Sequence, residues 1–175
     1  MPGEAREPLD YRETLLLFYE EEIEGEAYFA ALAERHDGHP KEALILLARV
    51  ETAVAAIVAP LLGRHGLVAK DRAALHACGR AQADAKNGVS WPELVAEMTR
   101  DFRVFVEEFE ALERLAPPND RERLRILTEH ETAAIAFLEL EAAGDPASLA
   151  PLERYLTRYG ADDRAGPTRL TEPAT

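Results

Sequence analysis

The stretch AYFAALAERHDGHPKEALILLARVETAVAAI, residues 27–57, is matched 80 residues later by EEFEALERLAPPNDRERLRILTEHETAAIAF, residues 107–137. Ten of the 31 aligned positions are identical, and the alignment needs no gap. Residues that interrupt helices fall at the same place in both copies, where Gly38 aligns with Pro118. The chain is therefore predicted to contain two related helical hairpins, which together decide the fold.

Apolar residues recur at helical spacing along most of the chain, and no stretch alternates with the two-residue period of a strand. We predict an all-α domain over residues 1–160, with a four-helix bundle at its centre. Its expected parts are hairpins at about 11–66 and 91–143, a crossover helix at about 70–86 and a short helix at about 146–159. Residues 161–175 contain few apolar side chains and are predicted to form a flexible tail.

Composition excludes several classes of partner. The net charge of −13 over 175 residues disfavours nucleic acid and anionic membranes, which both attract basic surfaces. The single cysteine, Cys78, rules out an intrachain disulfide and fits a reducing compartment. No positively charged, apolar leader opens the sequence, and no apolar run approaches the roughly 18 residues of a membrane span. We therefore expect a cytoplasmic protein.

Two glutamates interrupt the apolar faces of the predicted bundle. Glu51 falls on a stripe between Leu47 and Val54, and Glu131 occupies the equivalent position of the second hairpin. A buried carboxylate is costly unless it is protonated, paired or bound to a cation. Two such residues at duplicated positions therefore indicate a functional site.

Further acidic side chains are predicted to join this pair. Residues equidistant from the turn of an antiparallel hairpin lie at one level, and Glu24 and Glu51 are 14 and 13 residues from Gly38. Converging carboxylates raise one another's pKa unless a cation lies among them. The candidates from the first and third long helices are Glu24, with Glu21 as its alternate, and Glu108, with Glu107 as its alternate.

Residues 11–144 resemble the ferritin-like superfamily, whose bundles are two related helical hairpins joined by a crossover. The stretches that carry the resemblance are EEIEGEAY, residues 21–28, and LARVE, residues 47–51. In that family two helices each supply a glutamate, and the other two each supply a Glu-x-x-His pair, around two metal ions. The resemblance thus implies an iron or manganese site.

Carried over by position, Glu24 and Glu108 would be the single glutamates, and Glu51 and Glu131 would open the pairs. The two histidines are replaced by Val54 and Ala134. The chain therefore departs from the standard dinuclear site, although an all-carboxylate site for a harder ion stays open.

His130 is a further candidate, either as a metal ligand or as a catalytic acid or base. It precedes Glu131 and lies about 100° from it around the helix. The alternative interpretation is a histidine that forms an interhelical hydrogen bond at the flank of the core.

Three interpretations of function stay open. The first is a metal-binding protein or oxidoreductase. The second is a metal-free, homodimeric binding module of the same fold. The third is a metal-free enzyme that uses Glu51, Glu131 and His130 for proton transfer on an unidentified small molecule.

Overall fold

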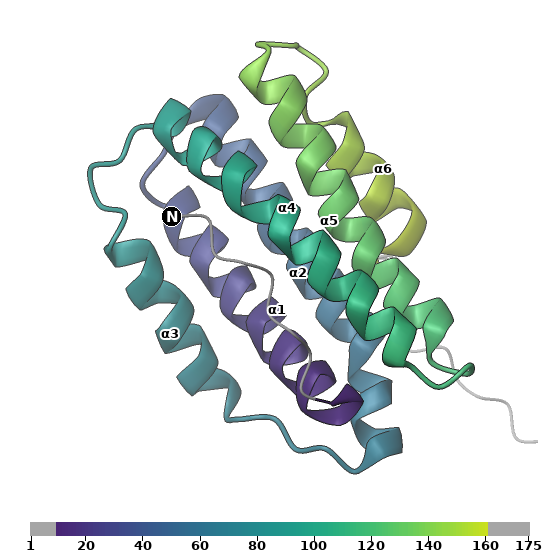
Figure 1. Ribbon diagram of the computed structural model, residues 1–175. Coiled ribbons are helices and arrows are strands. Elements are labelled where there is room, and N and C mark those ends of the chain that lie inside the picture. Colours follow the sequence, from purple (N-terminus) through teal and green to yellow (C-terminus); the bar gives the residue numbers. More distant parts are fainter. Residues whose placement is uncertain (1–9, 161–175) are drawn as a thin grey trace, which may run out of the picture.

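The computed structural model describes residues 10–160, which form six helices and no strand (Figure 1). The predicted all-helical class is confirmed over this part of the chain, while the predicted tail lies outside it. The helices are α1 (Tyr11–Ala33), α2 (Gly38–His65), α3 (Arg72–Asp84), α4 (Trp91–Leu115), α5 (Arg121–Ala142) and α6 (Ala150–Tyr159).

The helices pack as two hairpins with two additional helices outside them. α1 packs along α2, and α4 packs along α5. The hairpins meet where α2 contacts α5 and where α1 contacts α4. Figure 1 shows α3 lying beside α1 on the outside, and α6 lying beside α5. The interior between the four long helices is where the candidate site lies.

Local signals account for several helix ends. The Asp10 side chain caps α1 by accepting hydrogen bonds from the backbone N–H groups of Arg12 and Glu13, at 2.7 and 2.9 Å. α2 ends at Gly66, whose φ of 63° is the left-handed conformation that glycine adopts most readily. α6 begins at Ala150, later than predicted, because Asp145 accepts the N–H of Ala147 in a tight turn.

α2 is the most apolar helix, and one sequence-based expectation about it is wrong. It contains an 18-residue window with a mean hydropathy of 2.0, long and apolar enough to cross a membrane. Of that window, 56% is buried inside the protein, as in the core helix of a soluble protein. The prediction that no apolar run approaches the length of a membrane span is therefore wrong for α2, whose window combines alanines with large apolar residues.

Gly79 allows α3 to lie unusually close to α1. A Cβ atom at this position would lie 2.1 Å from the carbonyl oxygen of Glu24 and 3.0 Å from the backbone nitrogen of Tyr28. Neither backbone atom can move without displacing the helix. The close contact brings the end of α3 beside the segment of α1 that borders the candidate site.

Candidate functional site

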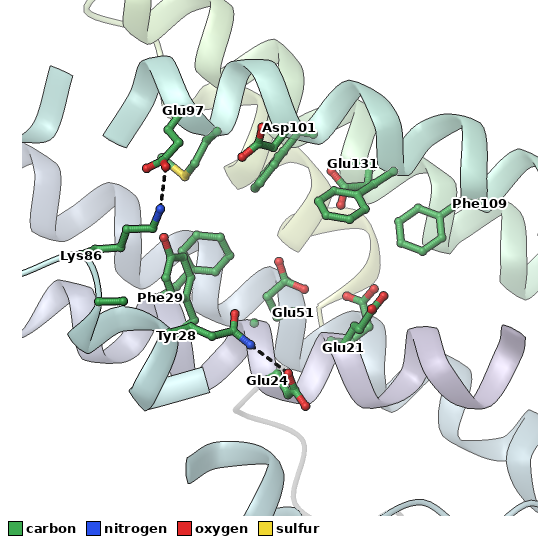
Figure 2. A pocket seen from close by; sticks show the side chains of 17 residues that line it. Glu21, Glu24, Tyr28, Phe29, Glu51, Lys86, Glu97, Asp101, Phe109 and Glu131 are labelled. Carbon is green, nitrogen blue, oxygen red and sulfur yellow. Dashed lines mark hydrogen bonds and ion pairs between the residues drawn. The ribbon is translucent and has the colours of Figure 1, made fainter. Parts of the chain in front are cut away.

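A cavity of about 510 Å³ lies between α1 and α4, with α2 and α5 behind it (Figure 2). Exposed side chains of Gln82 and Asp101 lie on its wall, so the cavity reaches the protein surface. Its size is within the range of small-molecule sites. Acidic side chains dominate the polar part of the lining: Glu21, Glu22, Glu24, Glu51, Glu97, Asp101 and Glu131.

Three of these carboxylates form a buried group with a histidine. Glu22, Glu51 and Glu131 are 3%, 8% and 6% exposed, and His130 is 2% exposed. His130 Nε2 lies 3.5 Å from Glu22 Oε2 and 3.5 Å from Glu131 Oε1. Figure 2 shows Glu51 and Glu131 reaching the same space from different helices. We call Glu22, Glu51, Glu131 and His130 the central group.

The orientation of His130 directs its second nitrogen at these carboxylates. Nδ1 makes a hydrogen bond with the carbonyl oxygen of Leu127 in the same helix. A carbonyl oxygen only accepts, so Nδ1 carries the proton and the neutral ring presents the lone pair of Nε2 to Glu22 and Glu131. A lone pair facing carboxylate oxygens is favourable only when a proton or a metal ion lies between them.

No lysine or arginine among residues 10–160 forms an ion pair with the carboxylates of the central group. Glu22 Oε2 and Glu131 Oε2 are buried and receive no hydrogen bond from any described residue. Among the described residues that line the cavity, Lys86 is the one lysine or arginine, and its Nζ pairs with Glu97 Oε1 at 2.6 Å. Such unsatisfied buried oxygens are costly.

Burial and mutual repulsion shift the pKa values within the group. Burial raises the pKa of Glu22 well above its ordinary value, and the charges of Glu51 and Glu131 raise it further. Burial and the Glu51 charge also raise the pKa of Glu131. Burial lowers the pKa of His130, although Glu51 opposes this shift. Without a cation, Glu22 and Glu131 therefore favour the protonated carboxyl, and His130 favours the neutral imidazole.

The geometry fits a single metal ion. Glu22, Glu51 and His130 each offer one ligand atom, and these atoms lie within 4.8 Å of one another. Ligand atoms at about 2.0–2.2 Å from a common metal ion are roughly 3–4 Å apart, so small side-chain shifts would complete the site. Glu131 Oε1 lies beside this set, 3.5 Å from His130 Nε2.

Gly25 makes room for the Glu51 carboxylate. A Cβ atom at residue 25 would lie 3.2 Å from Glu51 Cδ and 3.4 Å from Glu51 Oε2. Any larger residue would have to displace that carboxylate or the helix. The glycine therefore lets α1 and α2 approach while Glu51 still reaches the cavity.

The structure brings together some of the predicted site residues and separates others. Glu51, Glu131 and His130 belong to the central group. Glu24 lies at the edge of the cavity, where its carboxylate accepts a hydrogen bond from Gln82 at 3.0 Å. Its alternate Glu21 lines the cavity and is partly exposed.

The third long helix contributes no member of the central group. Glu108 is 3% exposed but does not line the cavity. Its alternate Glu107 is exposed. Val54 and Ala134, at the positions of the missing histidines, are buried apolar residues.

Glu22 was missed by the sequence analysis, although the sequence contains two signals for it. Phe18 and Phe29 are both buried, and Glu22 lies four and seven residues from them on the same helical face. Five residues before the aligned segments, the same 80-residue shift places Glu22 opposite Phe102, which lines the cavity. The same repeat aligns His130 with the buried Val50, which indicates that His130 faces inward.

No protein-family model matches this chain, and searches of curated proteins and of solved structures found no similar protein.

Proposed function

We propose that the chain is a divergent ferritin-like metalloprotein whose central group holds iron or manganese beside a substrate cavity. The observation that carries this proposal is the set of ligand atoms from Glu22, Glu51 and His130 within 4.8 Å of one another. The buried oxygens of Glu22 and Glu131 that lack a donor among the described residues support it. A divalent ion would neutralise these carboxylates and accept the Nε2 lone pair.

The donor set favours a first-row transition metal. Carboxylate oxygens suit magnesium, calcium and manganese, whereas imidazole suits zinc, copper, iron and nickel. A mixture of two carboxylates and one imidazole lies between these preferences, where manganese and iron fit. Such an ion would supply one-electron or Lewis-acid chemistry next to the cavity, and we therefore propose an oxidoreductase.

The protein's own residues have separable roles in this proposal. Glu22 and Glu51 bind the ion, and His130 binds it through Nε2. The Leu127 carbonyl fixes the tautomer and orientation of the His130 ring, a common arrangement for metal-bound histidines. Phe109 packs against His130, with ring centroids 5.5 Å apart, and limits the access of water to the group.

The ferritin-like bundle and its duplication are part of the same proposal. Pairing of α1 with α2 and of α4 with α5 supports it, as does the location of Glu51 and Glu131 at equivalent positions. The proposed ligand set differs from the family pattern because the histidine precedes its glutamate instead of following it by three residues. The central group has one histidine, whereas the family pattern has two histidines around two metal ions. This difference favours a single strongly held ion.

Elemental mass spectrometry tests this function on protein purified without chelator or nickel resin. We expect about one equivalent of iron or manganese in the wild-type protein. Glu51→Gln should lose it, whereas the control Glu24→Gln should retain it, because Glu24 already pairs with Gln82 outside the central group. Absence of metal from the wild-type protein after reconstitution with both ions would contradict the proposal. Loss of metal in Glu24→Gln would instead support the ligand set carried over from the family.

A metal-free proton-transfer enzyme is the second candidate. The raised pKa of Glu131 and the lowered pKa of His130 favour it, because a neutral carboxyl beside a neutral imidazole forms an acid and base pair. This candidate requires a wild-type protein that stays free of metal after reconstitution.

A further inference from the structure

One face of α4 changes from acidic to aromatic along the cavity. Glu97 and Asp101 come first, and three phenylalanines follow at helical spacing. The last of them lies at the central group, because Phe109 contacts His130. Eight residues separate Asp101 from Phe109, a rise of roughly 12 Å along the helix. The aromatic residues that line the cavity are Tyr28, Phe29, Phe102, Phe105 and Phe109.

The acidic end of the cavity already holds one alkylammonium group of the protein. The Lys86 side chain lies on the wall with its Nζ 2.6 Å from Glu97 Oε1 (Figure 2). Burial and the charges of Glu97 and Asp101 raise the pKa of the neighbouring Tyr28 hydroxyl to about 12. The region therefore has a negative potential, which attracts cations.

The inner end of the cavity is acidic as well. Glu22 and Glu131 line the cavity, are more than nine-tenths buried, and each has an oxygen with no donor among the described residues. An anionic ligand would meet repulsion at both ends of the cavity.

We propose that the cavity binds a small organic amine with an apolar body about 10 Å long. Its ammonium group pairs with Asp101 and Glu97 near the surface, and its body lies along Phe102 and Phe105. Aromatic faces attract a cation and also pack against an aryl or alkyl chain. The apolar end then lies next to the central group. Assigning this amine as the substrate rests on the proposed metal function, whereas its binding does not.

Isothermal titration calorimetry with 4-phenylbutylamine tests the inference on the full chain. The neutral 4-phenyl-1-butanol and the anionic 4-phenylbutyrate are matched probes of similar length. We expect the amine to bind roughly tenfold more tightly than the alcohol, with no detectable binding of the carboxylate. Equal affinity for the amine and the alcohol would overturn the inference.

Paired variants locate the ammonium site. Asp101→Asn should weaken amine binding roughly five- to tenfold and leave alcohol binding unchanged. Glu107→Gln is the control, because Glu107 is an exposed acid on α4 outside the cavity. Amine affinity that is unchanged in Asp101→Asn would overturn the proposed orientation.

Metal content measured on the same samples separates the two proposals. Metal-loaded protein without a preference for the amine would contradict only the inference about the ligand. Amine binding that depends on Asp101 in a protein unable to hold metal would support this inference and contradict only the metal function.

Discussion

Buried carboxylates occur in two kinds of surroundings in this protein. At the end of the long helices, Asp120 is 1% exposed and has three partners. Tyr11 donates to its Oδ2 at 2.7 Å, His65 lies 2.6 Å from the same oxygen, and Arg64 pairs with Oδ1. In the middle of the molecule, Glu22 and Glu131 are almost as deeply buried and each has an oxygen without a donor from the described residues.

Other buried or half-buried acids resemble Asp120. Glu20 accepts hydrogen bonds from the backbone N–H and the Nζ of Lys70, at 2.9 and 2.7 Å. Glu141 accepts a hydrogen bond from Trp91 Nε1 at 2.8 Å and pairs with His39. Where a carboxylate serves stability, this sequence supplies donors. The shortage of donors among the described residues at the central group therefore supports the proposal that a cation from outside the chain binds there.

The largest effect is expected from removing the imidazole of the central group. His130→Ala should weaken binding of Mn²⁺ or Fe²⁺ more than about a hundredfold, because loss of a direct ligand exceeds the 10–100-fold cost of losing an outer partner. Titration of the metal-free protein, followed by elemental analysis, measures this loss. His76→Ala is the control. His76 belongs to α3 and lies outside the central group, with its Nε2 3.7 Å from Glu26 Oε2. Equal affinities of the two variants would remove His130 from the ligand set.

Asp120→Ala should lower the stability of the protein and leave its metal content unchanged. Loss of the hydrogen bonds to a buried carboxylate should reduce the free energy of unfolding by about 2 kcal/mol. Urea denaturation of the chelator-treated protein measures the loss. The control is Asp37→Ala, because Asp37 is exposed and its side chain makes no capping hydrogen bond. A change below about 0.5 kcal/mol would mean that the Asp120 network does not stabilise the fold.

Glu131→Gln should stabilise the metal-free protein by about 1 kcal/mol at pH 7, because it removes a buried group that resists ionisation. The pKa of Glu131 is raised in the folded protein, so its contribution to stability is fully present below the unfolded pKa and is lost as pH rises through the folded pKa. The advantage of the variant should therefore grow from pH 5 to pH 8. Denaturation curves at both pH values measure this trend, and an advantage that shrinks with pH would show that the Glu131 charge is already compensated.

The same contrast explains what could be predicted from the sequence. Helix periodicity, the aligned breaks and the glutamates on apolar stripes are local properties, and they identified the helical class, Glu51 and Glu131. The choice among Glu21, Glu22 and Glu24 depends on how α1 is rotated about its axis, because successive residues differ by about 100°. In the structure α3 packs at Gly79 against the backbone of Glu24, the Glu24 side chain accepts a hydrogen bond from Gln82, and Glu22 is buried.

The smallest expected effect tests how finely the central group is positioned. Gly25→Ala would place a Cβ atom 3.2 Å from Glu51 Cδ, so the carboxylate must shift by a few tenths of an ångström. We expect metal affinity to fall roughly three- to tenfold, while the stability of the metal-free protein stays level or rises by about 0.5 kcal/mol, because alanine favours helix over glycine. Gly63→Ala, within α2 and with open space around its Cβ, is the matched control and should show only the gain in stability. If Gly25→Ala behaves like this control, the Glu51 carboxylate has room to relax, and the close approach of α1 serves packing alone.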